Sequence, residues 1–214
     1  MNTVPSIASN RTVWYLAAFH LFIIAISNYL VQIPVTLFGL HTTWGAISFP
    51  FIFLATDLTI RIYGAATARK IIFMAMLPAL LISYVLSVLF FEAQFQGTGA
   101  LSELNTFVAR IALASFVAYT LGQLLDVTVF SKLRQTRQWW VAPAASTIIG
   151  GFLDTLLFFA IAFYQSTDEF MAANWPEIAA VDYGIKLLVS LSLFVPAYGL
   201  LMNTLVKRIE PRAV

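Results

Sequence analysis

Residues 141–164 read VAPAASTIIGGFLDTLLFFAIAFY and decide how this chain folds. A helix that crosses a bilayer needs about 20 mostly apolar residues, and this stretch supplies them with a single charged side chain, Asp154. The apolar residues are continuous rather than alternating, which disfavours a membrane β-barrel. The sequence therefore predicts a transmembrane helix that carries a carboxyl group near its middle.

The whole chain shares this apolar character. Of its 214 residues 60% are hydrophobic and only 10% are charged, and the mean hydropathy is +0.86, whereas a soluble domain carries about 25% charged residues. The formal net charge of +2 is too small to indicate a nucleic-acid partner. The chain has no cysteine, and His20 and His41 are too far apart for a local metal motif. We therefore expect a membrane protein with no metal site and no cofactor.

Six stretches are long and apolar enough to span a bilayer. They run over Val13–Leu37, Trp44–Tyr63, Ile71–Phe91, Thr106–Leu125, Val141–Tyr164 and Ile178–Val206. The first is too long for the apolar core of a signal peptide, which has about 7–15 residues, so we expect it to be retained. The connections are too short for a separate domain. The chain is thus predicted to be an all-α, multi-pass membrane protein with one six-helix domain over residues 1–214.

Basic residues gather in alternate connections. The N-terminal tail, the second and fourth connections and the C-terminal tail contain Arg11, Arg69, Lys70, Lys132, Arg134, Arg137, Lys207, Arg208 and Arg212. The other three connections contain only acidic charges, at Glu92, Glu103, Asp168, Glu169 and Glu177. Because cytoplasmic loops are enriched in Lys and Arg, both termini are predicted to face the cytoplasm.

Several ionisable side chains fall inside the predicted spans, where each costs about 2.5–3.5 kcal/mol and therefore indicates a function. They are Asp57, Arg61, Arg110, Asp154, Asp182 and Lys186. The pairs Asp57/Arg61 and Asp182/Lys186 are each spaced by four residues, so each pair can neutralise itself on one helical face. Arg61 can also extend to the cytoplasmic surface.

Asp154 is the strongest single candidate for a functional residue. It has no cation within four residues, so its partner must be another helix, a ligand or a proton. Arg110 and Lys186 are candidate partners by depth. Asp126, in contrast, is expected at the cytoplasmic end of its span, where water can reach it.

The second predicted span opens with Gly45, Ser48 and Pro50, so its outer end is expected to be irregular and to line a cavity. Carboxylates, the Asn28 amide, a guanidinium and abundant aromatic rings are available to such a cavity. Together they suit a planar heterocycle with a donor-rich edge, because rings stack on its faces while a carboxylate accepts from its N–H groups.

Four stretches of the chain carry a recognisable pattern: HTTWGAISFP (residues 41–50), FLATDLTIRIYG (53–64), GQLLD (122–126) and DTLLFFAIAF (154–163). They resemble the queuosine precursor transporter family. The resemblance covers nearly the whole chain. It implies uptake of 7-cyano-7-deazaguanine, with the 7-aminomethyl form as a second candidate, across the bacterial inner membrane for queuosine synthesis in tRNA. It also implies a fold like that of the substrate-binding subunits of energy-coupling-factor transporters, which are six-helix bundles with a ligand cavity towards the outer side.

The resemblance also implies a set of substrate-binding residues. They are Asn28, Phe49, Asp57, Arg110, Asp154, Asp182 and Lys186. We expect Asp154 or Asp182 to accept from the donor edge of the deazaguanine, while Phe49 stacks on the ring. Arg110, Lys186 or Asn28 would donate to its carbonyl oxygen. Many members of the family carry a glutamate where Arg61 stands here, so no ligand role is predicted for Arg61.

Several alternatives stay open. The carrier can work alone, with or without a proton gradient, or with an energising partner, since the chain has no nucleotide-binding motif; a homodimer also stays open. The competing reading is an intramembrane aspartyl-type enzyme that uses Asp57 and Asp154. Neither aspartate lies in a Gly-x-Gly-Asp stretch, so we expect that the protein is not an enzyme. A purely scaffolding role would leave the charges within the spans without a purpose.

Overall fold

The computed structural model describes residues 8–30, 33–37, 40–91, 94–136 and 138–209, and helices dominate them. The helices are α1 (Asn10–Leu30), α2 (Trp44–Ser48), α3 (Pro50–Tyr63), α4 (Ala65–Leu89), α5 (Thr106–Leu133), α6 (Val141–Phe163), α7 (Glu169–Val189) and α8 (Val195–Ile209). Within this part of the chain, six helical segments are long and apolar enough to cross a membrane, with α2–α3 and α7–α8 each forming one span. The predicted number of spans is confirmed, and the chain is a multi-pass membrane protein.

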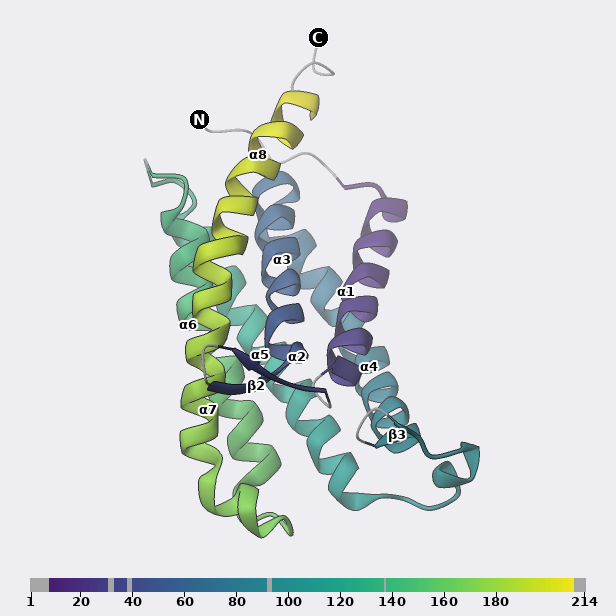
Figure 1. The fold of residues 1–214 in the computed structure, drawn as a ribbon. Helices are drawn as coiled ribbons and strands as arrows, with labels where there is room; N and C mark the ends of the chain where they lie inside the picture. The colour runs from purple at the N-terminus through teal and green to yellow at the C-terminus, as the bar shows by residue number, and fades with distance from the viewer. Residues whose placement is uncertain (1–7, 31–32, 38–39, 92–93, 137, 210–214) are drawn as a thin grey trace.

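The first span is shorter than predicted. Helix α1 ends at Leu30 rather than Leu37, and residues Pro34–Leu37 form strand β1 instead, which pairs antiparallel with β2 (Leu40–Thr43). Pro34 explains the difference, because proline has no N–H to donate to a helix and disfavours helical backbone in the residue before it. Strand β2 contacts α2 and α7, and the hairpin crosses the front of the bundle well short of the end that α7 reaches (Figure 1).

Two shorter elements complete the path between α4 and α5. Strands β3 (Phe90–Phe91) and β4 (Gln94–Phe95) pair antiparallel, and a 3-10 turn covers Thr98–Ser102. These elements lie at the lower end of the bundle in Figure 1, beyond α4. Together with the β1–β2 hairpin they are the features that the apolar pattern did not predict, because two- to four-residue strands leave no hydropathy signal.

The last span begins earlier than predicted and is interrupted. Helix α7 starts at Glu169, where the Asp168 side chain accepts from the Met171 N–H at 2.9 Å. A π-helical turn at Ser190–Phe194 separates α7 from α8, and the Val195 N–H donates to the Ser190 carbonyl five residues back. Pro196 follows this turn and cannot donate a helical hydrogen bond, which makes it a common neighbour of such irregularities.

Helix α5 is longer than predicted and changes the place of Asp126. The helix continues to Leu133, so Asp126 lies two turns inside it and is completely buried rather than within reach of water. The expected position at a wet boundary is therefore wrong. The apolar residues after Asp126, up to Phe130, continue the buried face of the helix.

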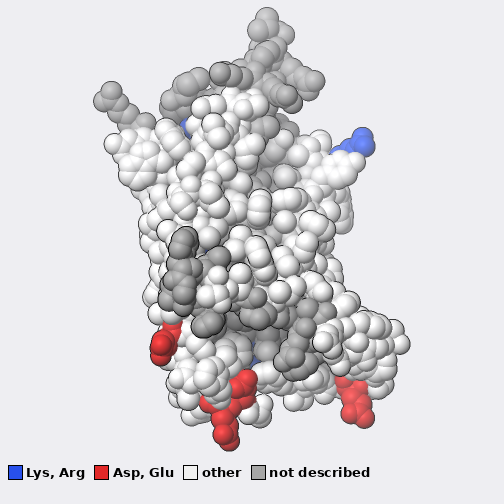
Figure 2. All heavy atoms as spheres, in the orientation of Figure 1, with Lys and Arg blue, Asp and Glu red and all other residues white. Residues whose placement is uncertain are grey.

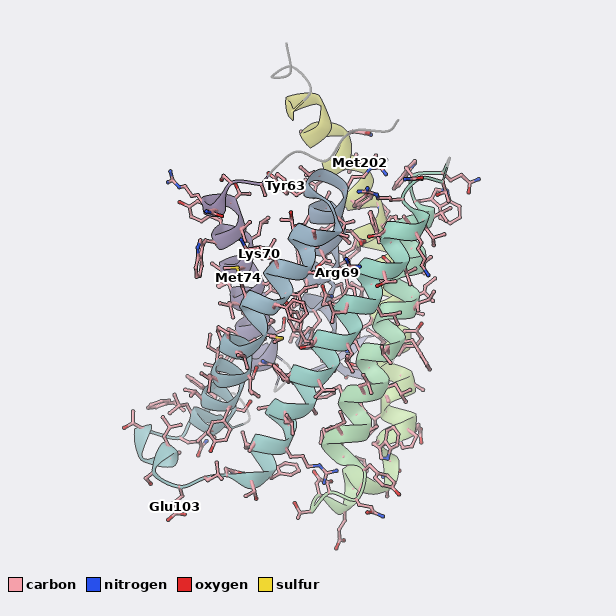
Figure 3. All side chains as sticks on the ribbon, turned by 180° about the vertical axis from the view of Figure 1, so that it is seen from behind. Tyr63, Arg69, Lys70, Met74, Glu103 and Met202 are labelled. Atoms are coloured by element: carbon pink, nitrogen blue, oxygen red, sulfur yellow. The ribbon has the colours of Figure 1, made fainter. Side chains whose placement is uncertain are left out.

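Charge is divided between the two ends of the bundle. Helix α1 begins and α8 ends at the same end (Figure 1). Arg69 and Lys70 lie towards that end and Glu103 lies at the other (Figure 3), while acidic side chains mark the lower end in Figure 2. Of the charges used for the predicted orientation, Glu92, Arg137, Arg212 and the side chains of Lys207 and Arg208 lie outside the described residues.

Helices α5 and α6 pack closely through two matching motifs. Each carries a glycine four residues before an aspartate, and the helices contact each other in opposite directions (Figure 1). A Cβ atom at Gly122 would lie 2.9 Å from the Asp154 Cβ, and one at Gly150 would lie 3.0 Å from the Asp126 Cβ. Each glycine thus makes room for the aspartate of the other helix, as small residues do in membrane interfaces.

Substituting Gly122→Ala is expected to lower the thermal stability of the purified protein, because a methyl group there must displace Asp154 or backbone. Overpacking of this kind costs about 1–3 kcal/mol. Gly184→Ala in α7 is the matched control, since a Cβ at Gly184 meets nothing within 4 Å. Equal melting temperatures for the two variants would contradict the close contact between α5 and α6.

Candidate functional site

A hollow lies between the second, fifth and sixth spans, and we call it the Lys186 hollow. Its volume is about 310 Å³ when the open space at its mouth is included. Its lining consists of Phe49, Pro50, Phe53, Thr147, Gly151, Asp154, Tyr183, Lys186, Leu187 and Ser190. The predicted irregularity of the second span is confirmed here, since α2 ends and α3 begins at the residues on either side of Phe49.

Three charged groups meet at this hollow. The Lys186 Nζ lies 2.7 Å from Asp182 Oδ2 on the same helix and 4.0 Å from Asp154 Oδ2 on α6. It also lies 3.4 Å from the Thr155 hydroxyl. The predicted self-neutralising pair Asp182/Lys186 is therefore present, and of the two cations considered for Asp154, Lys186 is the one that lies near it. Because Lys186 is held mainly by Asp182, the Asp154 carboxylate keeps capacity to accept hydrogen bonds.

Aromatic rings surround the charges. The Lys186 ammonium lies 5.6 Å from the centre of the Phe49 ring, within the range of a cation–π contact. Tyr183 contacts the Phe152 ring edge-on and donates from its hydroxyl to the Ile148 carbonyl at 2.9 Å, which fixes its ring beside the hollow. Phe49, Phe53 and Tyr183 thus offer flat apolar surfaces next to a carboxylate and an ammonium.

The Lys186 hollow is narrow. Between its side chains there is free room for about one water molecule. A bicyclic ring therefore enters only if the surrounding helices or rings move apart. The π-helical turn borders the hollow through Ser190, and the interruption between α2 and α3 borders it through Phe49 and Pro50, so two helix irregularities lie where such movement is needed.

A second hollow adjoins the first, and we call it the Asp57 hollow. Its volume is about 220 Å³ when the open space at its mouth is included, but between its side chains there is room for no more than about one water molecule. Its lining consists of Pro50, Phe53, Leu54, Asp57, Pro143, Thr147, Ser190, Phe194, Val195 and Tyr198. Four residues line both hollows, so the two are neighbours along α3 and α6. The Ser146 hydroxyl donates to Asp57 Oδ1 at 3.2 Å, and Asp57 also interacts directly with Asp126. The predicted pairing of Asp57 with Arg61 is not seen among the described ion pairs.

Three of the predicted substrate-binding residues line neither hollow. Asp182 is linked to the Lys186 hollow only through its ion pair with Lys186, and Asn28 and Arg110 lie elsewhere. The Asn28 amide donates to the Ser83 hydroxyl at 2.5 Å and joins α1 to α4. The Arg110 guanidinium donates to carbonyls at the end of α6, including that of Ile161 at 2.6 Å, and to that of Tyr164. Both side chains therefore serve contacts between helices in this structure.

Several lining residues were not predicted. On α6, Thr147 and Gly151 lie seven and three residues before Asp154, on the same helical face. On the last span, Tyr183 lies three residues before Lys186 and Ser190 four residues after it, again on the same face. Their spacing from the charged residues could therefore have predicted them from the sequence. Phe53, four residues after Phe49, carries the same signal on the second span.

Comparison with known proteins places the chain in a family. The family model described as "Putative vitamin uptake transporter" matches residues 43–201. The chain belongs to the vitamin uptake transporter family. Within this family it is 58% identical over 213 residues to the queuosine precursor transporter of Escherichia coli, covering 100% of this chain and 96% of the relative.

Two further proteins are similar to this chain. A probable queuosine precursor transporter of Haemophilus influenzae is 54% identical over 212 residues, covering 94% of this chain and 90% of the relative. One from Bacillus subtilis is 34% identical over 180 residues, covering 81% and 77%. No solved structure matches, so the predicted likeness to energy-coupling-factor subunits stays a prediction.

The vitamin uptake transporter family is named for transport, which supports the prediction that the protein is not an enzyme. The competing aspartyl-enzyme reading also lacks support from the site. Asp57 and Asp154 line different hollows, and each interacts with other charged groups, Asp126 in the first case and Lys186 in the second.

Substituting Arg110→Met is expected to lower thermal stability, because the carbonyls at the end of α6 lose their donors, while the affinity for substrate stays unchanged. The loss of a charged hydrogen-bond donor costs about 1.5–3 kcal/mol. Melting curves and equilibrium binding on the same purified variant separate the two effects. Weaker substrate binding at an unchanged melting temperature would show instead that Arg110 contacts the substrate.

Proposed function

We propose that this protein carries 7-cyano-7-deazaguanine across the bacterial inner membrane and binds it in the Lys186 hollow. The observation that carries the proposal is the Asp154 carboxylate, which faces a ring-lined hollow inside the membrane with its nearest cation 4.0 Å away. The queuosine precursor transporter of E. coli is 58% identical over the full chain, which supports the substrate class. The 7-aminomethyl form stays a second candidate.

The chemistry of the ligand matches the side chains of the hollow. A 7-deazaguanine presents an N1–H and an exocyclic amine on one edge, and a carboxylate such as Asp154 accepts from both in a bidentate manner. Its carbonyl oxygen is adjacent to that edge and needs a donor. The Lys186 ammonium, 4.0 Å from Asp154 Oδ2, is positioned to donate to it. Phe49 and Tyr183 supply the faces for stacking. Asp182 holds Lys186 in place rather than contacting the ligand.

The orientation belongs to the same proposal. Both ends of the chain and the basic connections are assigned to the cytoplasm, because Lys and Arg accumulate on that side of membrane proteins. The acidic end with Glu103 then faces the periplasm (Figure 3). In this orientation the β1–β2 hairpin lies on the periplasmic side of α2, so that substrate arriving from outside meets the hairpin before the Lys186 hollow.

Substituting Asp154→Asn is expected to abolish uptake in cells that cannot make the precursor, measured as queuosine in tRNA. The amide keeps the shape but places an NH2 group against one of the two ligand donors and removes the negative charge; loss of a charged hydrogen bond costs about 1.5–3 kcal/mol, or about 10- to 150-fold in affinity. Asp168→Asn is the matched control, because Asn caps α7 as well as Asp does. Normal uptake by Asp154→Asn at equal membrane expression would remove Asp154 from the site.

Binding to the purified protein tests the ligand edge separately. An analogue without the exocyclic amine leaves one Asp154 oxygen without its donor and is expected to bind at least about tenfold more weakly than 7-cyano-7-deazaguanine. Displacement of the labelled deazaguanine gives the ratio. Equal affinities in the native protein would show that no carboxylate reads this edge of the ring.

A further inference from the structure

Two carboxyl groups outside the Lys186 hollow face each other in the interior. Asp57 on α3 is 2% exposed and Asp126 on α5 is fully buried, and their carboxyl groups interact directly. Both lie against neighbouring turns of α6, because Ser146 donates to Asp57 Oδ1 at 3.2 Å and a Cβ at Gly150 would lie 3.0 Å from the Asp126 Cβ. Two ionised carboxylates that interact in a low-dielectric interior repel each other strongly, and one of them normally keeps a proton. The pair therefore has a place for one proton that the binding of substrate does not use.

No cation among the described side chains neutralises this pair. Arg61 lies one turn from Asp57, but its Nη1 donates to the Arg134 carbonyl at 2.7 Å. Arg134 donates in turn to the Ile60 carbonyl at 3.1 Å. Neither arginine forms an ion pair with Asp57 or Asp126 in the part of the chain described. A proton is thus the missing positive charge.

The other titratable groups near the pair come from three helices. Tyr198 on α8 lines the Asp57 hollow and interacts electrostatically with Asp57, Arg61 and Arg134. Asp154 on α6 lies opposite Gly122, one turn from Asp126, and is charge-paired with Lys186. His20 on α1 contacts the Tyr119 hydroxyl at 3.1 Å, two turns from Asp126. None of these groups supplies a positive charge to the two carboxyls.

The hydrogen bonds of the pair are incomplete without a proton. Ser146 has one hydroxyl hydrogen, which it can give either to Asp57 Oδ1 at 3.2 Å or to the Pro143 carbonyl at 3.3 Å. Both oxygens of Asp126 are buried and accept no hydrogen bond of ordinary geometry from the described residues. A buried carboxylate oxygen without a donor is costly, and a proton held between the two acids supplies the donor.

We propose that Asp57 and Asp126 share one proton and form the site that couples uptake of substrate to entry of protons. With one proton the pair consists of a carboxylic acid that donates to a carboxylate, and its net charge is −1. Close packing favours a proton over a larger ion, because a Cβ at Gly150 would lie only 3.0 Å from the Asp126 Cβ and the Asp57 hollow has no room for a hydrated cation.

Coupling to the substrate follows from shared walls and rests on the proposed function of the Lys186 hollow. Pro50, Phe53, Thr147 and Ser190 line both hollows. Asp126 and Asp154 also lie in the two matching contacts between α5 and α6, so a shift of these helices moves both carboxyls together. The proton on the pair and the ligand on Asp154 therefore respond to the same movement.

Infrared spectroscopy of the purified protein without substrate tests the shared proton. At neutral pH we expect a carboxylic-acid C=O band that shifts in heavy water and is lost in Asp57→Asn and in Asp126→Asn. Asp154→Asn should keep the band. Absence of the band from the native protein, or its survival in both pair variants, would overturn the proposal whether or not the protein transports deazaguanine.

Proteoliposomes at zero membrane potential test the coupling. A gradient of one pH unit, alkaline inside, should accumulate 7-cyano-7-deazaguanine up to about tenfold if one proton enters with each substrate. Asp126→Asn should still bind substrate and equilibrate it but lose accumulation, while Asp168→Asn keeps it. Accumulation driven by sodium instead, or undiminished in Asp126→Asn, contradicts the proton site. Failure of the native protein to bind deazaguanine at all would contradict only the proposed function, since the infrared band is independent of it.

Discussion

The contact between α5 and α6 is the constraint on which the other parts of the site depend. Gly122 faces Asp154 and Gly150 faces Asp126, so each helix accepts an aspartate of the other in a place where a side chain would not fit. Without hydrophobic driving force between helices in lipid, close approach through small residues is a main source of association. Here the same approach buries two carboxyl groups, and both hollows lie beside it. Stability and chemistry therefore use the same residues.

Buried charge is treated differently on the two sides of this contact. Around Asp154, the cation Lys186 is present but is held by Asp182 at 2.7 Å, which leaves one carboxylate in excess. Around Asp126, the nearby cations Arg61 and Arg134 donate to backbone carbonyls instead. With the one proposed proton, the Asp57/Asp126 pair therefore also has one carboxylate in excess. Each cluster thus has one carboxylate without a matching cation, and in the first cluster the N–H groups of a ligand can donate hydrogen bonds to it.

The apolar pattern of the sequence predicted the number of spans. The charges within them singled out Asp154 and Lys186, and the family resemblance added Phe49; the structure places all three at one hollow. The apolar pattern did not predict that α1 ends at Leu30, because Pro34 and the short strands act through backbone geometry rather than through hydropathy. Nor did it predict the burial of Asp126 or the role of Arg110 at the end of α6. Both depend on the rotation of one helix against another, about which a linear pattern carries little information.

The π-helical turn at Ser190–Phe194 has a geometric consequence for the last helix. A π-turn contains about one more residue per turn than an α-helix. This extra residue rotates all later side chains around the helix axis. One residue corresponds to a rotation of about 100° around the helix axis. Tyr198, which lines the Asp57 hollow and is 1% exposed, would therefore turn away if the turn rewound as regular α-helix. The five residues of the π-turn therefore determine which face of α8 points inward and lines the Asp57 hollow.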